Sequence, residues 1–389
     1  MKRNRLGRRG GLPRDAEQLL WLANGLAESS SRAEDHFWDQ RLAGAVDALL
    51  AAEDEDALNT ALDHLSTAST HAYDELADMI ESRAEGALKS DNQYDVLLIT
   101  APVMAWSRYR IPATSIAAAV MANLRVHLKA HVFAKDVKLA LADFLFSPDQ
   151  LPQGYCATAD FATHLGKAAQ SDTDLHIKTD DLPETAQFLS DNRYLLGAVV
   201  VPKGAQIFRW QEEDCTREQA LEQWRAQGGA CIAPLLTGCA FEVVLPNAYF
   251  AASREADKAS RPYSIQASAA FLSTTLDAPA AGLRAVVAPF FERQVEEFRI
   301  GFTLRGQNEV VHGVVWPLLG AEDESSETLG EIEATLQACG ITDILVLDNE
   351  FPMEYCDDCG APMYPSPEGE AVHAELPEEQ AEQMPKHLH

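Results

Sequence analysis

Two cysteines near the C-terminus carry the clearest chemical signal in the chain. Cys356 and Cys359 are separated by two residues, and Gly360 follows directly. A tight turn of this kind lets both thiolates point at one tetrahedral ion, and the glycine admits the backbone geometry that the turn needs. The spacing therefore predicts half of a structural zinc site.

A closed zinc site needs two more ligands, and the downstream histidines are the candidates. His387 and His389 form a His-Leu-His end that can present both imidazoles from an extended strand, with His373 as their substitute. We expect one Zn²⁺ to hold this segment, which is too short for a core of its own. Two other interpretations stay open: a reduced, metal-free turn, or final histidines that belong to an unstructured end. A thioredoxin-like redox pair is not favoured, because the cysteines do not open a helix after a strand and the adjacent Asp357 and Asp358 would raise the thiol pKa.

Arginines that follow two expected strands form a second candidate site. Ligands of α/β proteins bind beyond the carboxyl ends of the strands. Arg108 and Arg110 follow the first of these strands, and Arg254 and Arg261 follow the second. These side chains could converge on a phosphate or a carboxylate. The alternative is that they form structural ion pairs with neighbouring carboxylates.

The signatures of common catalytic sites are absent from the sequence. It has no Walker loop, no Gly-x-Gly-x-x-Gly, no Gly-x-Ser-x-Gly and no His-Glu-x-x-His. His127 and His131 could share a helix face, but no glutamate lies between them. The catalytic residues, if the protein has any, stay unknown from sequence.

The elements that must position these residues begin with a helical region. Leucines recur at three-to-four spacing through residues 15–90, and Glu34 lies three residues after Ser31 in a capping-box arrangement. Residues 1–14 precede this region and carry six Lys or Arg without an acidic residue. We expect them to form a disordered basic arm, with contact to RNA or an acidic partner as the alternative.

From Tyr94 the pattern changes to short apolar strands alternating with helices, and this pattern occurs twice. Tyr-Asp-Val-Leu-Leu at 94–98 matches Phe-Glu-Val-Val-Leu at 241–245, and an Ala-rich helix follows each, at 114–129 and 263–276. The match predicts an α/β (α+β) protein with a duplicated strand–helix–strand–hairpin–helix unit and a cleft between the copies.

The expected boundaries follow from this match. The first copy spans 94–238 with an insertion at 149–192, and the second copy spans 241–350. Prolines recur in residues 351–389, which we expect to form an irregular zinc-knuckle tail.

Composition limits the compartment and the partners. The formal net charge is −29, which disfavours DNA, general RNA adsorption and anionic membranes. No apolar run approaches the length of a membrane span, and no apolar segment follows the basic start. Seven cysteines, an odd number, do not form a disulfide framework. A cytoplasmic location is expected.

Four segments are distinctive enough to carry a family resemblance: 95–112, 144–152, 253–264 and 355–365. On these segments, and over nearly its whole length, the chain resembles a betaproteobacterial family filed under domain of unknown function 2863. The resemblance implies no established activity, and it assigns no catalytic residue.

The sequence thus favours a non-catalytic, cytoplasmic binding protein with a zinc-held tail. Its partner would be a protein or a ribonucleoprotein, because a basic arm and a metal knuckle accompany the absence of catalytic motifs. The alternative is an enzyme that acts on a small anionic substrate in the cleft between the copies, with Arg108, Arg254 and Arg261 as anion ligands.

Overall fold

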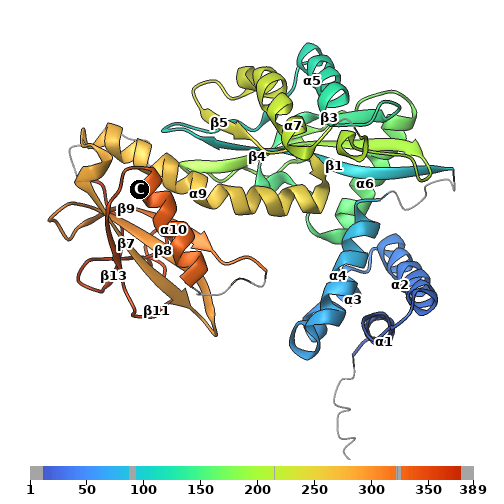
Figure 1. Ribbon diagram of the computed structural model, residues 1–389, viewed down its shortest axis with the longest axis horizontal. Helices are drawn as coiled ribbons and strands as arrows, with labels where there is room; N and C mark the ends of the chain where they lie inside the picture. The colour runs from blue at the N-terminus through green and yellow to red at the C-terminus, as the bar shows by residue number, and fades with distance from the viewer. Residues whose placement is uncertain (1–11, 87–92, 214, 321, 323–325, 378–389) are drawn as a thin grey trace, which may run out of the picture.

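The computed structural model contains a helical N-terminal region followed by two large sheets, which one long helix joins (Figure 1), and a two-stranded sheet of β12 (Tyr364–Pro365) and β13 (Ala371–Val372) near the C-terminus. It describes residues 12–86, 93–213, 215–320, 322 and 326–377. The mixture of helices and sheets confirms the predicted α/β (α+β) class, and the helical N-terminal region is confirmed as well.

The N-terminal region consists of amphipathic helices whose leucine-rich faces share one core. Side-chain oxygens of Ser31, Asp54 and Ser69 accept hydrogen bonds of 3.1–3.3 Å from backbone N–H groups in the first turns of three of these helices. Such caps satisfy donors that have no partner inside the helix. The helices are α1 (Arg14–Ala27), α2 (Arg32–Ala52), α3 (Glu55–Ala68) and α4 (Thr70–Ala84).

The first sheet is antiparallel and has the order β2-β3-β4-β1-β5, with β6 also paired to β1. Helices α5 and α7 cover one face, and α6 and the long helix α9 (Tyr249–Thr275) cover the other (Figure 1). Both faces of β1 and β4 are therefore buried, which explains their long apolar runs. The elements are β1 (Tyr94–Trp106), β2 (Thr114–Ser115), α5 (Ala118–His131), β3 (Lys138–Phe146), α6 (Gly154–Gln170), β4 (Ser190–Pro202), α7 (Arg217–Gln223), β5 (Ala240–Val243) and β6 (Asn247–Ala248).

The second sheet has the order β10-β7-β8-β9, with β11 parallel to the end of β7. Helix α10 and the C-terminal half of α9 pack on one face, and the C-terminal segment crosses the other. The elements are α9 (Tyr249–Thr275), β7 (Leu283–Phe291), β8 (Val295–Leu304), β9 (Val310–Pro317), α10 (Ser326–Ala338), β10 (Asp343–Val346), β11 (Phe351–Pro352), β12 (Tyr364–Pro365) and β13 (Ala371–Val372).

Helix α9 joins the two sheets, since its first half packs on β1 and β4 and its second half on β9 and α10 (Figure 1). Arg261 lies buried near its middle, where it donates hydrogen bonds to the Pro317 carbonyl (3.1 Å) and to Glu322 (2.5 Å). Although α9 has 27 residues, it is too polar to span a bilayer, and none of the other helices in the described ranges is long and apolar enough to do so.

The duplicated units and their boundary at residue 241 are not confirmed. The strand at 240–243, expected to open a second copy, is β5, and it pairs antiparallel with β1 at the edge of the first sheet. The two strands that the match equates thus lie side by side in one sheet. An apolar pattern specifies a buried strand but does not specify the neighbour with which the strand pairs.

One detail of the match also differs. The helix expected at 263–276 begins at Tyr249 and runs through Pro262, so residues 253–261 are helical and do not form a loop after a strand. The segment at 149–192, expected as an insertion, contains α6 and reaches into the start of β4, whereas β7 and β8 are joined by a short turn.

The contact between α4 and α9 predicts a dependence of stability on pH. The Glu85 carboxylate accepts a hydrogen bond from the Phe250 N–H (3.3 Å), and burial raises the pKa of this side chain to about 7. The folded protein then binds a proton that the unfolded chain releases near pH 4.5, so stability is present at low pH and is lost as the pH rises from about 4.5 to 7. Between pH 5 and pH 8 we expect wild type to lose about 2 kcal/mol more unfolding free energy than Glu85→Gln, measured by urea titration. Equal losses in the two proteins would contradict this prediction.

Candidate metal centre

A buried arginine holds the cysteine-containing segment against the second sheet. Arg299 of β8 has no exposed surface, and its guanidinium donates to the carbonyls of Glu354 (2.6 Å) and Met363 (2.8 Å). It also pairs with Glu297 (2.6 Å) and lies 5.0 Å from the centre of the Tyr355 ring. The two carbonyls stand before and after the two cysteines, so Arg299 fixes both ends of the turn that carries them.

Between these two ends, the backbone forms a short hairpin. The Met363 N–H donates to the Glu354 carbonyl, and the Cys356 N–H donates to the Ala361 carbonyl (2.8 Å). The turn closes with a bond from the Gly360 N–H to the Cys356 carbonyl (2.8 Å), and Gly360 has a φ of 71°. This left-handed conformation suits glycine, as the sequence predicts.

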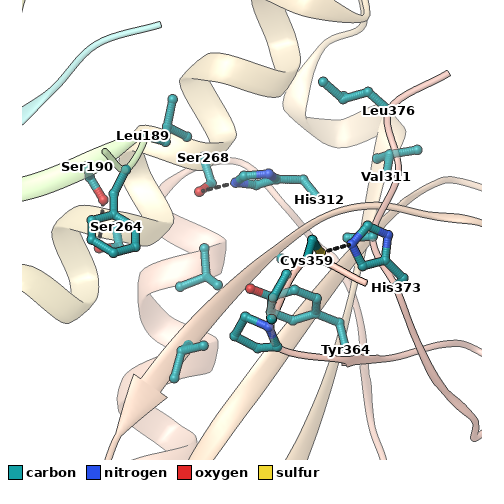
Figure 2. A pocket seen from close by; sticks show the side chains of 18 of the residues that line it. Leu189, Ser190, Ser264, Ser268, Val311, His312, Cys359, Tyr364, His373 and Leu376 are labelled. Carbon is teal, nitrogen blue, oxygen red and sulfur yellow. Dashed lines mark hydrogen bonds between the residues drawn. The ribbon is translucent and has the colours of Figure 1, made fainter. Parts of the chain in front are cut away.

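The hairpin and the strand pair that follows it bring three ligand atoms together. Sulfur atoms of Cys356 and Cys359 and a ring nitrogen of His373 lie within 4.8 Å of one another. His373 comes directly after β13, which pairs antiparallel with β12, and its Nε2 is 3.3 Å from the Cys359 Sγ (Figure 2). Ligand atoms of a tetrahedral zinc ion are separated by roughly 3.3–3.8 Å, so small side-chain rotations suffice to close the group on an ion.

A carboxylate orients the histidine from behind. Glu375 Oε1 lies 3.3 Å from Nδ1 of His373, the ring nitrogen that faces away from the cysteines. If Nδ1 carries the proton, Nε2 presents its lone pair to the sulfur atoms. Metal-bound histidines commonly have such a carboxylate partner, which fixes the tautomer and raises the basicity of the ligand nitrogen.

The electrostatics of the turn favour a thiolate at Cys356. Backbone N–H groups of Asp358 and Cys359 point at its sulfur and lower the pKa of this thiol. The sequence led us to expect a raised thiol pKa from Asp357 and Asp358. For Cys356 that expectation is wrong, because the backbone donors outweigh the charge of Asp358.

The structure brings together three of the five residues considered as metal ligands. His373, named in the sequence as a substitute, joins Cys356 and Cys359, whereas His387 and His389 lie outside the described residues. Glu375 was not anticipated. Its spacing of two from His373 would have identified it, because alternate residues of an extended segment lie on the same side.

The arginines of the second candidate site do not meet in one place. Arg254 pairs with Glu81 of α4 (2.5 Å) and Arg261 with Glu322, while Arg110 lines a different cavity from Arg254. Because residues 254 and 261 are two turns apart on a helix, each reaches a separate acidic partner. For this pair the geometry agrees with the structural ion pairs that were the alternative interpretation.

A cavity of about 540 Å³ lies next to the three ligands. Its walls come from the start of β4, from α9, from β9 and from the C-terminal segment, so it lies where the two sheets meet. Cys359 and His373 line one side, and the other side carries two hydrogen-bonded pairs, Ser190–Ser264 (3.0 Å) and Ser268–His312 (3.0 Å) (Figure 2).

His312 is a half-buried residue to which the sequence analysis assigned no role. It belongs to β9 and lies against Ser268 and Phe271 of α9, and desolvation lowers its pKa to about 4, which keeps the ring neutral near pH 7. No charged side chain lines this cavity among the described residues apart from the candidate ligands.

The comparisons identify the family but add no chemistry. The model of a family described as protein of unknown function (DUF2863) matches residues 4–387 of the chain. No curated protein and no solved structure matches it.

Two glycines allow the C-terminal segment to lie flat on the sheet, and this close approach yields a stability prediction. A Cβ at Gly301 of β8 would lie 2.3 Å from the Pro365 carbonyl oxygen, and one at Gly313 of β9 would lie 2.3 Å from the Tyr364 ring. Gly301→Ala should push β12 off the sheet, lower the unfolding free energy by about 1–3 kcal/mol and accelerate proteolysis between residues 351 and 376. The matched control is Gly330→Ala in α10, where the new Cβ meets nothing within 4 Å. Equal proteolysis of the two variants would contradict this seating.

The ligand geometry predicts which substitutions weaken metal binding. Protein purified with reductant should contain about one zinc ion per chain. Cys356→Ser, Cys359→Ser and His373→Ala should each release the ion, and Glu375→Gln should weaken binding about 10–100-fold, because it only orients His373. Elemental analysis and chelator competition measure these effects, with Cys215→Ser as the control because Cys215 lies outside the ligand group. Retention of the full metal content in all three ligand variants would contradict the assignment.

Proposed function

The chain belongs to the family described as protein of unknown function (DUF2863), and we propose that it is a cytoplasmic, non-catalytic binding protein whose C-terminal segment is held by a structural zinc ion. The observation that carries the zinc centre is the meeting of Cys356, Cys359 and His373, with Glu375 behind the histidine. Arg299 holds the hairpin in place without an ion, so the ion would bind to ligands that the fold has already brought together.

Zinc suits this donor set better than other common divalent ions. Two thiolates and an imidazole are softer ligands than the oxygen atoms that Mg²⁺ and Ca²⁺ require. The ion has no electronic preference against a tetrahedral arrangement, and zinc with cysteine and histidine ligands stabilises short segments throughout protein structures. The net charge of −29 adds a long-range field that attracts cations to the protein.

Free thiols support the proposed compartment. The cysteines are all unpaired, and a CxxC pair that binds zinc must stay reduced. Cytosolic reductants maintain thiols in this state.

An exposed aromatic cluster on the helical region supports the binding role. The cluster consists of Trp21 of α1 with Phe37 and Trp38 of α2, whose rings meet edge to face at 5.0 and 5.1 Å. Trp21 is 58 % exposed and Phe37 is 45 % exposed. Arg41 lies 4.4 Å above the Phe37 ring. Aromatic and arginine side chains are the groups most enriched where proteins bind one another.

The charges beside this aromatic cluster favour a protein as the partner. Exposed acidic residues flank it, including Glu28, Glu34, Asp35 and Asp39. A phosphate backbone would meet repulsion from them, whereas a partner with basic side chains at its rim would not. The basic residues 1–11, which precede α1 in sequence and lie outside the described residues, would carry any contact to RNA.

Site-specific crosslinking tests this surface in the native host. A photoreactive amino acid at position 21 should capture one defined protein, because Trp21 is the most exposed ring of the cluster. The control is the same amino acid at Val126 of α5, which is equally exposed but lies outside the cluster. Trp21→Ala with Phe37→Ala should abolish copurification of the captured protein and leave the thermal unfolding midpoint within a few degrees of wild type.

The same experiment separates the competing partners. Capture of the same proteins from positions 21 and 126 would contradict a dedicated surface. Association that disappears with ribonuclease treatment or with deletion of residues 2–11, but survives the aromatic substitutions, would assign the binding role to the basic arm and RNA.

A further inference from the structure

We propose that the metal ion also binds a small, mainly apolar molecule through a thiol or a heterocyclic nitrogen, with the body of that molecule in the cavity beside the ligands. This inference rests on the proposed zinc centre. The described residues supply three ligand atoms, whereas a tetrahedral ion accepts four. Sites with three protein ligands characteristically leave the fourth position to a water molecule or an exogenous ligand.

The free position lies on the cavity side of the ligand group. Cys359 and His373 line the cavity, but Cys356 does not. Figure 2 shows Cys359 and His373 beside the Tyr364 ring, with the Ser268–His312 pair across the space from them. An ion bound by the three residues would therefore stand at one wall of an existing cavity, and a ligand could reach it from inside.

The composition of the walls favours a molecule with an apolar body. Leu189, Val311, Val314, Tyr364 and Leu376 are among the residues that line the space, and its volume of about 540 Å³ fits the body of a small organic molecule. Phe188, 58 % exposed, also lines the cavity and offers an apolar edge where it meets solvent. The hydroxyl groups of Ser190, Ser264 and Ser268 and the ring of His312 add a few neutral hydrogen-bonding groups.

Charge selects the head group. Two thiolates already neutralise a divalent ion, and no other charged side chain lines the cavity within the described part of the chain. Desolvation keeps His312 neutral near pH 7, so it supplies no positive charge to a bound anion. A phosphate or another multiply charged group would enter without compensation, whereas a soft, neutral or singly charged donor fits a thiolate-bound zinc ion.

Cobalt substitution makes both the site and its free position visible. Co²⁺ bound to full-length protein should give thiolate-to-cobalt charge-transfer absorption and the intense visible bands of a tetrahedral ion. Imidazole, ethanethiol and benzyl mercaptan, titrated separately without oxygen, should shift the visible bands with saturation, and inorganic phosphate should not. Benzyl mercaptan should bind roughly tenfold more tightly than ethanethiol, because its ring occupies the apolar cavity.

A pair of variants on one helix tests the role of the cavity. Ser264 of α9 lines the cavity, so Ser264→Leu should remove the preference for benzyl mercaptan while imidazole still binds. Ser260→Leu, one turn earlier on α9 and not among the cavity-lining residues, should leave the preference intact.

The outcomes distinguish the two proposals. Absence of charge-transfer absorption would overturn the metal centre and this inference together. Tetrahedral cobalt that none of the three donors perturbs would overturn this inference alone. Sensitivity to donors that arises only in His387→Ala with His389→Ala would also overturn it, because a terminal imidazole would then be the fourth ligand. An unchanged preference in Ser264→Leu would exclude the cavity as the binding place.

Discussion

The buried guanidinium of Arg299 is the interaction on which the C-terminal half of the structure depends. A charge without exposed surface is costly unless every donor is paired, and the groups that pair with it come from two places. Glu297 belongs to the same strand, but the carbonyls of Glu354 and Met363 belong to the C-terminal segment. Removing that segment would leave N–H donors of a buried guanidinium without acceptors, with Glu297 as the remaining partner of the charge. The cysteine turn is therefore packed as an integral part of the second sheet, and Leu376 supports the same conclusion because it packs into the core of that sheet.

Arginines play the same part at two other junctions. Arg193 of β4, almost fully buried, donates to the carbonyls of Ile111 and Pro112 at 2.8 Å and so fixes the segment that leaves β1. Arg261 joins α9 to the end of β9 through Pro317 and Glu322, with its guanidinium 4.9 Å from the Trp316 ring. The chain has a net charge of −29, yet these three arginines are buried. Each planar guanidinium can donate hydrogen bonds to several carbonyl oxygens at once.

Sequence reasoning succeeded where local chemistry decides the structure and failed where pairing between distant segments decides it. The CxxC turn, its glycine and the capping of α2 depend on neighbouring residues, and the sequence contains that information. The pairing of β5 with β1 depends on contact between distant segments, which an apolar pattern does not specify. The partners of Arg261 depend on the continuation of α9 through Pro262, whereas proline commonly stands at the start of a helix. His373 was named only as a substitute ligand, because two distant contacts bring it to Cys359. Strand β12 pairs with β13, and β12 lies against strands of the second sheet that are more than fifty residues earlier in the chain.

The candidate metal centre lies where three parts of the fold that are far apart in sequence meet. The cavity beside it takes its walls from residues 187–190, from α9 and β9, and from the segment that carries the ligands. Holding that segment in place therefore also completes the cavity, and any molecule that fills the cavity favours the arrangement in which the ligands meet. By linkage, each binding event must strengthen the other to the same extent, since both stabilise the same seated state of the C-terminal segment. An ion whose role was only to hold the C-terminal segment could be bound by any exposed hairpin of that segment. Because the candidate ligands lie at the junction of the two sheets, an ion bound there would depend on how the two sheets are placed relative to each other.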